Sequence, residues 1–344
     1  MRILALESSC DETACAVVED AQVLSSVVSS QIAVHRAFGG VVPELASRHH
    51  VTSIVPVVRE AMARAGLAHA WASVDAVAVT EGPGLMGALL VGVQLARGLA
   101  AALGRPLYGI HHLEGHLWSA FLGDEARPAT RFVPHLALIV SGGHTELVDV
   151  QGLGRYHILG RTRDDAVGEA YDKVGKMLGL GYPGGPMIDR LAQEGDPVAI
   201  RFPRSMLHQD NDAFSFAGLK TAVLVHLEKG GAPRSRAELT DICASFQAAV
   251  IDVLVGKACR ARRVLRAGRL HVVGGVAANR GLRAAMASAA ARDGFEFGAV
   301  PLRYCGDNAA MIGAAAAARA AAGARPSVYV SSSASLDSDR VAIT

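Results

Sequence analysis

Two stretches of this chain repeat one simple pattern, in which a short apolar run, a polar turn and a second apolar run follow one another. The first pair of runs covers residues 3–8 and 14–18, and the second covers residues 136–140 and 146–150. Apolar runs of this length around a polar turn are typical of a strand, a turn and a strand. The repetition suggests an internal duplication, with one such hairpin opening each of two domains.

Strand-like and helix-like patterns alternate through the rest of the chain. Apolar runs at 76–80, 107–110 and 270–273 are interleaved with helical patterns at 43–65 and 87–103, and with a third that begins at Gly281. Alternation of this kind predicts an α/β fold, with mostly parallel or mixed sheets covered by helices. A stretch rich in charge and proline, residues 123–134, is the expected domain boundary. A last Ala-rich helix is expected at 307–322, followed by a Ser-rich tail that we expect to be frayed.

Composition places this 344-residue chain among two-domain cytoplasmic proteins. Its hydrophobic content of 51% supports a large core, and its five scattered cysteines contain no Cys-x-x-Cys pair, as in a reducing compartment. Glu7 comes too early for a signal peptide. The apolar run 87–103 is interrupted by Gln94 and Arg97, which favours a buried helix over a membrane span. The net charge of +2 excludes no ligand class, so any basic surface must be local.

A histidine pair is the strongest chemical signal in the chain. His112 and His116 are four residues apart, which places their Cβ atoms about 5–6 Å apart on one helix face, within reach of one metal ion. Far downstream, Asp307 lies in a Gly-containing turn. Two imidazoles and one carboxylate leave open coordination positions, which a catalytic metal needs, and they suit iron and zinc alike. A lone pair with this spacing is often accidental; the Gly-rich turns elsewhere in the chain favour a site.

The same segment argues against a metallopeptidase. The zinc peptidase motif His-Glu-x-x-His places the glutamate directly after the first histidine. Here Glu114 comes two residues after His112, so on a helix it turns away from the metal face.

Three Gly-rich turns could approach an anion closely. They are 141–145 (Ser-Gly-Gly-His-Thr), Gly274-Gly275 and 181–186 (Gly-Tyr-Pro-Gly-Gly-Pro). Backbone N–H groups in such turns and at helix starts can bind phosphate, although any one of them alone could be a plain tight turn. Together they favour nucleotide binding, without a Walker A or a Gly-x-Gly-x-x-Gly motif. Asp172 and Asp189 could accept hydrogen bonds from ribose or cap helices, and Asn279 could read a nucleoside edge or cap a helix.

One basic run is more ambiguous. Residues 257–269 carry several arginines that could follow a phosphate backbone, but a solvated helix face is the commoner reason for such a run.

The motifs in combination resemble the TsaD family of tRNA threonylcarbamoyladenosine transferases, formerly called Gcp or O-sialoglycoprotein endopeptidases. The resemblance covers residues 2–325, and its opening segment is similar to the bacterial branch. It rests on the segments 7–13 (Glu-Ser-Ser-Cys-Asp-Glu-Thr), 39–48 (Gly-Gly-Val-Val-Pro-Glu-Leu-Ala-Ser-Arg), 111–116 (His-His-Leu-Glu-Gly-His), 140–145 (Val-Ser-Gly-Gly-His-Thr), 181–186, 214–220 (Phe-Ser-Phe-Ala-Gly-Leu-Lys), 274–279 (Gly-Gly-Val-Ala-Ala-Asn) and 307–312 (Asp-Asn-Ala-Ala-Met-Ile).

The resemblance implies an actin-like ATPase (ASKHA) fold, with two RNase H-like domains and a cleft between them. The first domain would be residues 1–133, with helix 307–325 returning to it, and the second would be 134–306, leaving 327–344 as the tail. One metal, usually iron, would be held by His112, His116 and Asp307. The nucleotide-bearing substrate would be bound by Val140, Ser141, Gly142, Gly143, His144, Asp172, Gly185, Asp189 and Asn279. Gly306 stands where many relatives have Thr, which should loosen the turn without removing a ligand.

The implied reaction moves a threonylcarbamoyl group from threonylcarbamoyl-AMP to the exocyclic amine of adenosine 37, in tRNAs that read codons beginning with A. A metal with open positions suits a carbonyl that must be polarised for so weak a nucleophile, and the Gly-rich turns suit the departing AMP phosphate. Asp11, in the first hairpin turn, is our candidate for orienting or deprotonating the amine. The resemblance also implies the protein partners TsaB and TsaE, with TsaC supplying the adenylate. The alternatives are a small-molecule kinase of the same fold and a non-catalytic nucleotide-binding scaffold.

Overall fold

The computed structural model describes residues 1–336 and divides into two compact units. Unit 1 consists of Met1–Val133, Val150–His157 and the described residues from Asp307 onward. Unit 2 consists of Pro134–Asp149 and Ile158–Gly306. Unit 1 is therefore assembled from three separate stretches of the chain.

The sheet of unit 1 has five strands in the order β3-β2-β1-β4-β5. The first three strands are antiparallel neighbours, whereas β4 pairs parallel to β1 and β5 pairs parallel to β4. The strands are β1 (Arg2–Glu7), β2 (Glu12–Glu19), β3 (Gln22–Ser30), β4 (Ala76–Gly82) and β5 (Leu107–His111).

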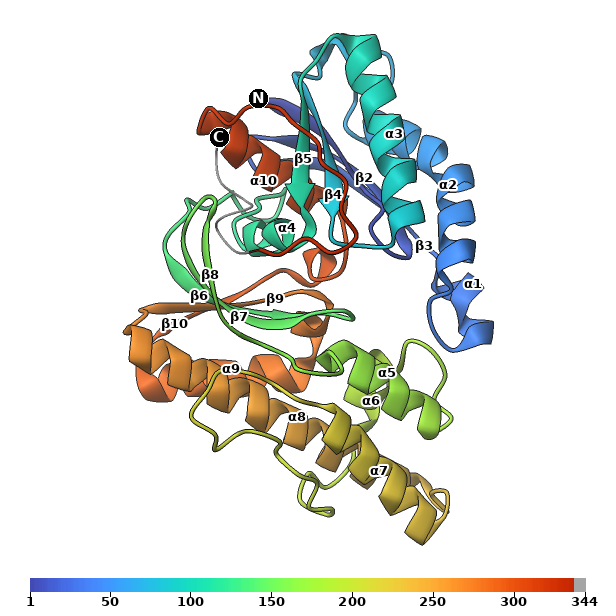
Figure 1. Cartoon of the computed structure of the whole chain (residues 1–344), viewed down its shortest axis with the longest axis vertical. Coiled ribbons are helices and arrows are strands. Elements are labelled where there is room, and N and C mark those ends of the chain that lie inside the picture. Colours follow the sequence, from blue (N-terminus) through green and yellow to red (C-terminus); the bar gives the residue numbers. More distant parts are fainter. Residues whose placement is uncertain (337–344) are drawn as a thin grey trace. The chain divides into compact units, whose positions relative to one another are not determined.

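Helices cover both faces of this sheet, which explains why its inner strands β1 and β4 are buried along almost their whole length (Figure 1). Leu4 and Leu6 pack into the core beneath α2 and α3, whereas Ala5 points to the opposite face, against Gly313 of α10. The helices of unit 1 are α1 (Ile32–His35), α2 (Pro43–Arg64), α3 (Met86–Leu103), α4 (His112–Ser119) and α10 (Ala309–Ala321). Helix α10 begins where the Asn308 side chain accepts a hydrogen bond from the Met311 amide, at 3.1 Å.

Among residues 1–336, two helices are long and apolar enough to cross a membrane by length and composition alone, a property that the core helices of folded proteins share. In the most apolar 18-residue stretch of α8 (Arg236–Leu265), 72% of the residues are buried within the protein. In the corresponding stretch of α3, 33% of the residues are buried. The prediction of a buried helix at 87–103 is therefore only half right. Helix α3 buries Val93 and Ala96 against the sheet and leaves Leu90 exposed, because it lies in a single outer layer of helices.

The sheet of unit 2 repeats the plan of unit 1. Its order is β10-β9-β6-β7-β8. If the strands of each sheet are numbered one to five along the chain, both sheets have the same order, 3-2-1-4-5. The strands are β6 (His135–Val140), β7 (Thr145–Gly152), β8 (Arg155–Arg161), β9 (Arg269–Val273) and β10 (Glu296–Ala299), and β9 is parallel to β6 and β10. This repetition supports the internal duplication that the two hairpins suggested.

The helices of unit 2 are α5 (Val167–Met177), α6 (Gly184–Leu191), α7 (Ala217–Gly230), α8 and α9 (Arg280–Asp293) (Figure 1). The basic run at the end of α8 is largely used within the unit. Arg260 pairs with Asp212, Arg263 pairs with Asp293, and the Arg262 guanidinium lies 4.7 Å from the centre of the Phe295 ring. Packing within the unit thus accounts for much of this run.

The start of the C-terminal tail differs from the frayed segment that the sequence predicted. The Gly109 amide of β5 donates to the Ser327 carbonyl at 2.7 Å, and the Ser331 amide donates to the Glu81 carbonyl of β4 at 2.9 Å. The reason is that β5 is an edge strand with backbone groups free to pair. The last part of the predicted tail, residues 337–344, lies outside the described residues.

Candidate functional site

The structure brings His112, His116 and Asp307 together within unit 1. The Asp307 Oδ1 atom lies 3.5 Å from His112 Nε2 and 3.3 Å from His116 Nε2. One ligand atom from each residue lies within 4.8 Å of the other two, so the three form a group that could hold a metal ion. The two imidazole rings are nearly perpendicular, with their centres 4.8 Å apart.

Local structure explains why these three side chains converge. Strand β5 ends at His111, and α4 begins at the next residue, so the helical spacing carries His112 and His116 on one face. Asp307 directly precedes the residue that caps α10. The two helices can approach closely because Gly115 has no side chain: a Cβ there would lie 2.8 Å from the Ile312 Cδ1 atom.

His112 is held by groups that the sequence analysis did not single out. Its Nδ1 atom lies 3.1 Å from the Glu7 carboxylate and 3.2 Å from the Ser9 hydroxyl. Thr80 donates a hydrogen bond to the same Glu7 oxygen. An imidazole that donates from Nδ1 to a carboxylate keeps Nε2 for a metal, and such outer partners tune metal binding. In the sequence, the feature that could have indicated this role of Glu7 is an acidic residue at the end of an apolar strand.

The chemistry of the cluster fits a divalent cation. Burial would lower the pKa of His112, but Asp307 and Glu7 outweigh it and hold that pKa well above its usual value. Burial would likewise raise the pKa of Asp307, yet its attraction to His112 and its hydrogen bonds to both imidazoles hold it well below. Within residues 1–336, the Nδ1 atom of the fully buried His116 has no hydrogen-bond partner, and its Nε2 atom faces only Asp307, at 3.3 Å. Two imidazole Nε2 atoms that converge on one buried carboxylate match the donor set of a metal site.

Asp11 lies in the turn between β1 and β2 that also carries Ser9, so its turn adjoins the cluster through the contact of Ser9 with His112. Its neighbour Glu12, which the sequence analysis did not select, has an unusual environment. Burial raises the pKa of Glu12 to about 9, and the charges of Asp11 and Asp307 add to that effect. Burial and these neighbouring charges thus favour the protonated form of Glu12, the first residue of β2.

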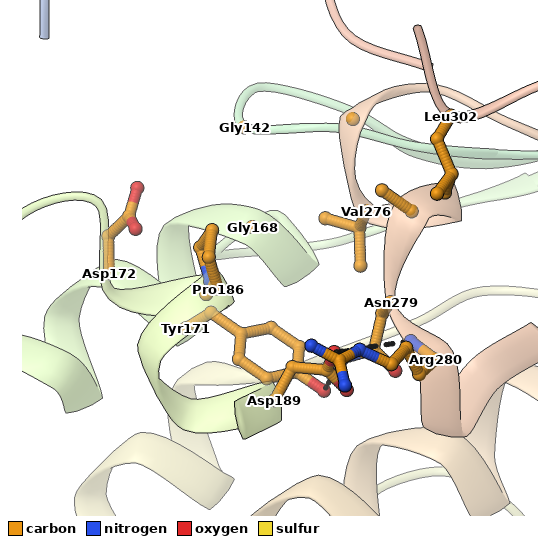
Figure 2. A pocket seen from close by; sticks show the side chains of 13 residues that line it. Gly142, Gly168, Tyr171, Asp172, Pro186, Asp189, Val276, Asn279, Arg280 and Leu302 are labelled. Carbon is orange, nitrogen blue, oxygen red and sulfur yellow. Dashed lines mark hydrogen bonds and ion pairs between the residues drawn. The ribbon is translucent and has the colours of Figure 1, made fainter. Parts of the chain in front are cut away.

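Unit 2 contains a pocket of about 410 Å³, a size typical of small-ligand sites (Figure 2). Five of the predicted nucleotide-binding residues line it: Gly142, Asp172, Gly185, Asp189 and Asn279. The other four, Val140, Ser141, Gly143 and His144, belong to the end of β6 and the following turn and are not among the lining residues. Residues that the prediction did not name also line it, including Gly168, Tyr171, Pro186, Val276, Arg280 and Leu302.

The polar side chains of the pocket are tied to one another. Gln247 of α8 donates to Asp189 Oδ1 at 3.2 Å and accepts from Asn279 Nδ2 at 2.7 Å. Asn279 also caps α9 by accepting from the Leu282 amide at 2.8 Å, and Asp172 accepts from the Gly184 amide at the start of α6. The capping roles considered for Asn279 and Asp172 are therefore present, and both residues still line the pocket. Gln247 was missed because nothing marks it within a 30-residue helix.

Apolar side chains supply the remaining wall. Val276 and Leu302 lie together on one side of the pocket, whereas the Asp172 carboxylate stands apart on the other (Figure 2). Leu302 is 65% exposed, so this apolar surface is open at its edge. The pocket therefore combines a polar end with a surface suited to a flat apolar ring.

The glycines of the turns differ in what they require. Gly274 has φ +94°, and a Cβ there would lie 2.5 Å from the Val140 carbonyl oxygen, so only glycine fits. At Gly142 and Gly143 no described atom lies within 4 Å of a built Cβ, and φ is ordinary at both. A side chain at either position would therefore meet neither a described atom nor an unfavourable φ. Open space over these two residues remains compatible with a ligand that approaches them.

Solved structures with the same overall arrangement define the class of fold. Component A of (R)-2-hydroxyglutaryl-CoA dehydratase from Acidaminococcus fermentans matches with a TM-score of 0.54 at 16% identity, over 92% of this chain and 96% of that one. Full-length HypF, solved in a phosphate- and nucleotide-bound form, matches with a TM-score of 0.61 at 13% identity, over 92% of this chain and 46% of that one. The chain thus has the actin-like ATPase fold, as its motifs implied.

Sequence relatives then identify the family. The model of TsaD, tRNA N6-adenosine threonylcarbamoyltransferase, matches residues 22–314. A protein of that name from Trichlorobacter lovleyi is 55% identical over 99% of this chain and 98% of its own length. Another from Anaeromyxobacter dehalogenans is 58% identical over 91% of this chain and 92% of its own. The chain belongs to the TsaD family of tRNA-modifying transferases.

Proposed function

We propose that this chain transfers a threonylcarbamoyl group from threonylcarbamoyl-AMP to the N6 amine of adenosine 37, in tRNAs that read codons beginning with A. The observation that carries the proposal is the His112–His116–Asp307 cluster, found in a chain of this family. In the reaction, a C–N bond forms at the carbamoyl carbon and the C–O bond to the AMP phosphate breaks. The amine loses one proton.

His112, His116 and Asp307 would hold the metal, which we propose to be iron, with zinc as the alternative. When bound, a metal of this kind supplies a Lewis acid that polarises the carbonyl of the donor. Glu7 keeps the His112 ring oriented through Nδ1. Asp11 is our proposed acceptor for the amine proton, because its turn adjoins the cluster through the contact of Ser9 with His112.

We propose that the pocket of unit 2 holds the adenosine monophosphate part of the donor. The apolar side chains of Val276 and Leu302 suit the face of a purine, and Asp172 and Asp189 can accept hydrogen bonds from ribose hydroxyls. Backbone amides around Gly142 and Gly275 are available to a phosphate. This division matches the polar and apolar sides of the pocket.

The partners are proposals of the same kind. Exposed apolar residues on the neighbouring helices α2 and α3, namely Val51, Val55 and Leu90, support docking of a protein partner, which we propose to be TsaB. TsaE would join this pair, and TsaC would supply threonylcarbamoyl-AMP. We also propose a cytoplasmic location, which a tRNA substrate would favour.

The test uses the purified full-length chain with these partners, threonylcarbamoyl-AMP and a tRNA that carries unmodified adenosine 37. We expect threonylcarbamoyladenosine in the digested tRNA, by mass spectrometry, and an equal amount of AMP. His112→Ala should lose most of the product, whereas His69→Ala, which removes an exposed histidine of the same unit, should not. Transfer of the γ-phosphate of ATP to a small alcohol, with no modified nucleoside, would instead establish a kinase. Binding of nucleotide with no transfer of either group would support the third alternative, a non-catalytic nucleotide-binding scaffold.

A further inference from the structure

Glu114 lies between the two histidines on α4, a position where a catalytic role could be expected. Both oxygens of its side chain have partners outside the metal cluster. It is completely buried. Tyr156, in the Val150–His157 segment of unit 1, donates its hydroxyl to Glu114 Oε1 at 2.7 Å. Arg319 of α10 approaches Oε2 with Nε at 2.9 Å and Nη2 at 2.8 Å. With both oxygens occupied, this carboxylate is not placed to take a proton from a substrate.

The ion pair joins the same two helices that supply the metal ligands. Helix α4 carries His112 and His116, and α10 begins two residues after Asp307 and carries Arg319 in its last turn. Between these points, Gly115 rests against Ile312 and Met311. The two helices are therefore fixed to each other near both ends of α10, once by the metal cluster and once by the ion pair.

Stability alone is a poor reason for this arrangement. A buried ion pair loses much of its attraction to desolvation, and well-packed apolar side chains often replace one without loss of stability. A guanidinium that contacts a carboxylate through two nitrogens does fix geometry, because it limits both the distance and the angle between the two side chains. A fixed geometry matters where metal ligands from two helices must bind one ion.

We infer that Glu114 and Arg319 are positioning residues, which set the placement of α4 against α10 and thereby the separation of the two imidazoles from Asp307. Tyr156 holds the second oxygen of Glu114 and so fixes the carboxylate in the plane that Arg319 needs. The inference rests on the proposed metal role of the cluster and is independent of the transfer reaction.

The experiment measures metal binding directly in the full-length chain, freed of metal and titrated with Co²⁺, whose visible absorption reports ligand geometry. Affinity is obtained by competition with a chelator. Glu114→Gln should weaken Co²⁺ binding at least tenfold and shift the absorption bands. The matched control is Met62→Ala, a cavity in the core beneath α2, away from α4 and α10. It should lower the unfolding temperature and leave Co²⁺ affinity and spectrum unchanged.

A double substitution separates positioning from packing. Glu114→Leu with Arg319→Leu should recover most of the thermal stability lost in Glu114→Gln, but not the Co²⁺ affinity or spectrum. Recovery of affinity together with stability would overturn the inference, and so would wild-type affinity in Glu114→Gln. If Glu114→Gln does not fold, Tyr156→Phe takes its place. We expect this variant to bind Co²⁺ more weakly, and unchanged Co²⁺ affinity would contradict the inference. Absence of Co²⁺ binding by the wild-type chain would refute the metal centre itself, and the inference with it.

Discussion

The Oε2 atom of Glu7 lies 3.1 Å from Nδ1 of His112, on the side of the imidazole opposite Asp307. Glu7 is fully buried at the end of β1, so the central strand of unit 1 is connected directly to the candidate metal centre. A carboxylate in this position decides which nitrogen of the histidine is left for a metal.

Replacing Glu7 with Gln should therefore weaken metal binding without removing a ligand. Outer partners of this kind typically contribute about 10–100-fold to metal affinity. Metal content after dialysis against a graded chelator, measured by plasma mass spectrometry, gives the result. Glu19→Gln, at the exposed end of β2, is the control. Equal metal retention in both variants would show that Glu7 does not act through His112.

His116→Ala should reduce bound metal to near background, because it removes one of the three ligands. The substitution also deletes a fully buried ring, so the fold must be checked by circular dichroism. His69→Ala, an exposed histidine, should keep its metal. Full occupancy in a folded His116→Ala protein would refute the assignment of the cluster.

Two glycine substitutions in unit 2 should affect different properties, one the stability of the fold and the other the affinity for AMP. Gly274→Ala should destabilise the fold by about 1–3 kcal/mol or more, because φ is positive and the Val140 carbonyl blocks a Cβ. Gly142→Val, where no described atom is near, should leave the unfolding midpoint almost unchanged and weaken AMP binding. Thermal unfolding and calorimetry with AMP test the pair. Unaltered AMP affinity in Gly142→Val would mean that the turn is only structural.

Gln247→Leu should weaken nucleotide binding by disordering the polar end of the pocket. It leaves Asp189 Oδ1 and Asn279 Nδ2 without their Gln247 partner, and each buried polar group left unpaired costs about 1–3 kcal/mol. Gln94→Leu, at an exposed position of α3 in unit 1, should bind AMP as the wild type does. Comparable losses in both variants would argue against a role for the network.

Asp165 should make unit 2 sensitive to acid. Burial would raise its pKa, but hydrogen bonds from Lys173 and Lys220 outweigh this and hold the pKa below its usual 3.8. The stabilisation is therefore present above about pH 4 and is lost as the pH falls through the lowered value. Asp165→Asn should unfold more easily than the wild type at pH 7, with the difference shrinking towards pH 3. A difference that stayed constant with pH would contradict this.

Local patterns predicted most of the helices and strands, whereas the predicted nucleotide-binding set rested on the family resemblance. The two hairpins indicated a duplicated plan, and helical spacing placed His112 and His116 on one face. Glu7 and Gln247 escaped because their roles depend on which strand or helix end lies beside them, which no local pattern records. The half-exposed face of α3 and the pairing of the tail with β5 escaped for the same reason. Of the two roles that the sequence allowed for Asn279, the structure shows the helix cap, in which Oδ1 accepts from the Leu282 amide. Its Nδ2 atom donates to Gln247, and contact with a nucleoside stays a prediction.

The discontinuity of unit 1 has a consequence for the proposed metal cluster in a newly made chain. His112 and His116 are synthesised early, but Asp307 follows only after the whole of unit 2 has been translated. A ribosome that stops anywhere before residue 307 releases a chain with two imidazoles and no carboxylate to complete the set. Metal capture by all three proposed ligands would thereby be reserved for chains that have been translated at least as far as residue 307.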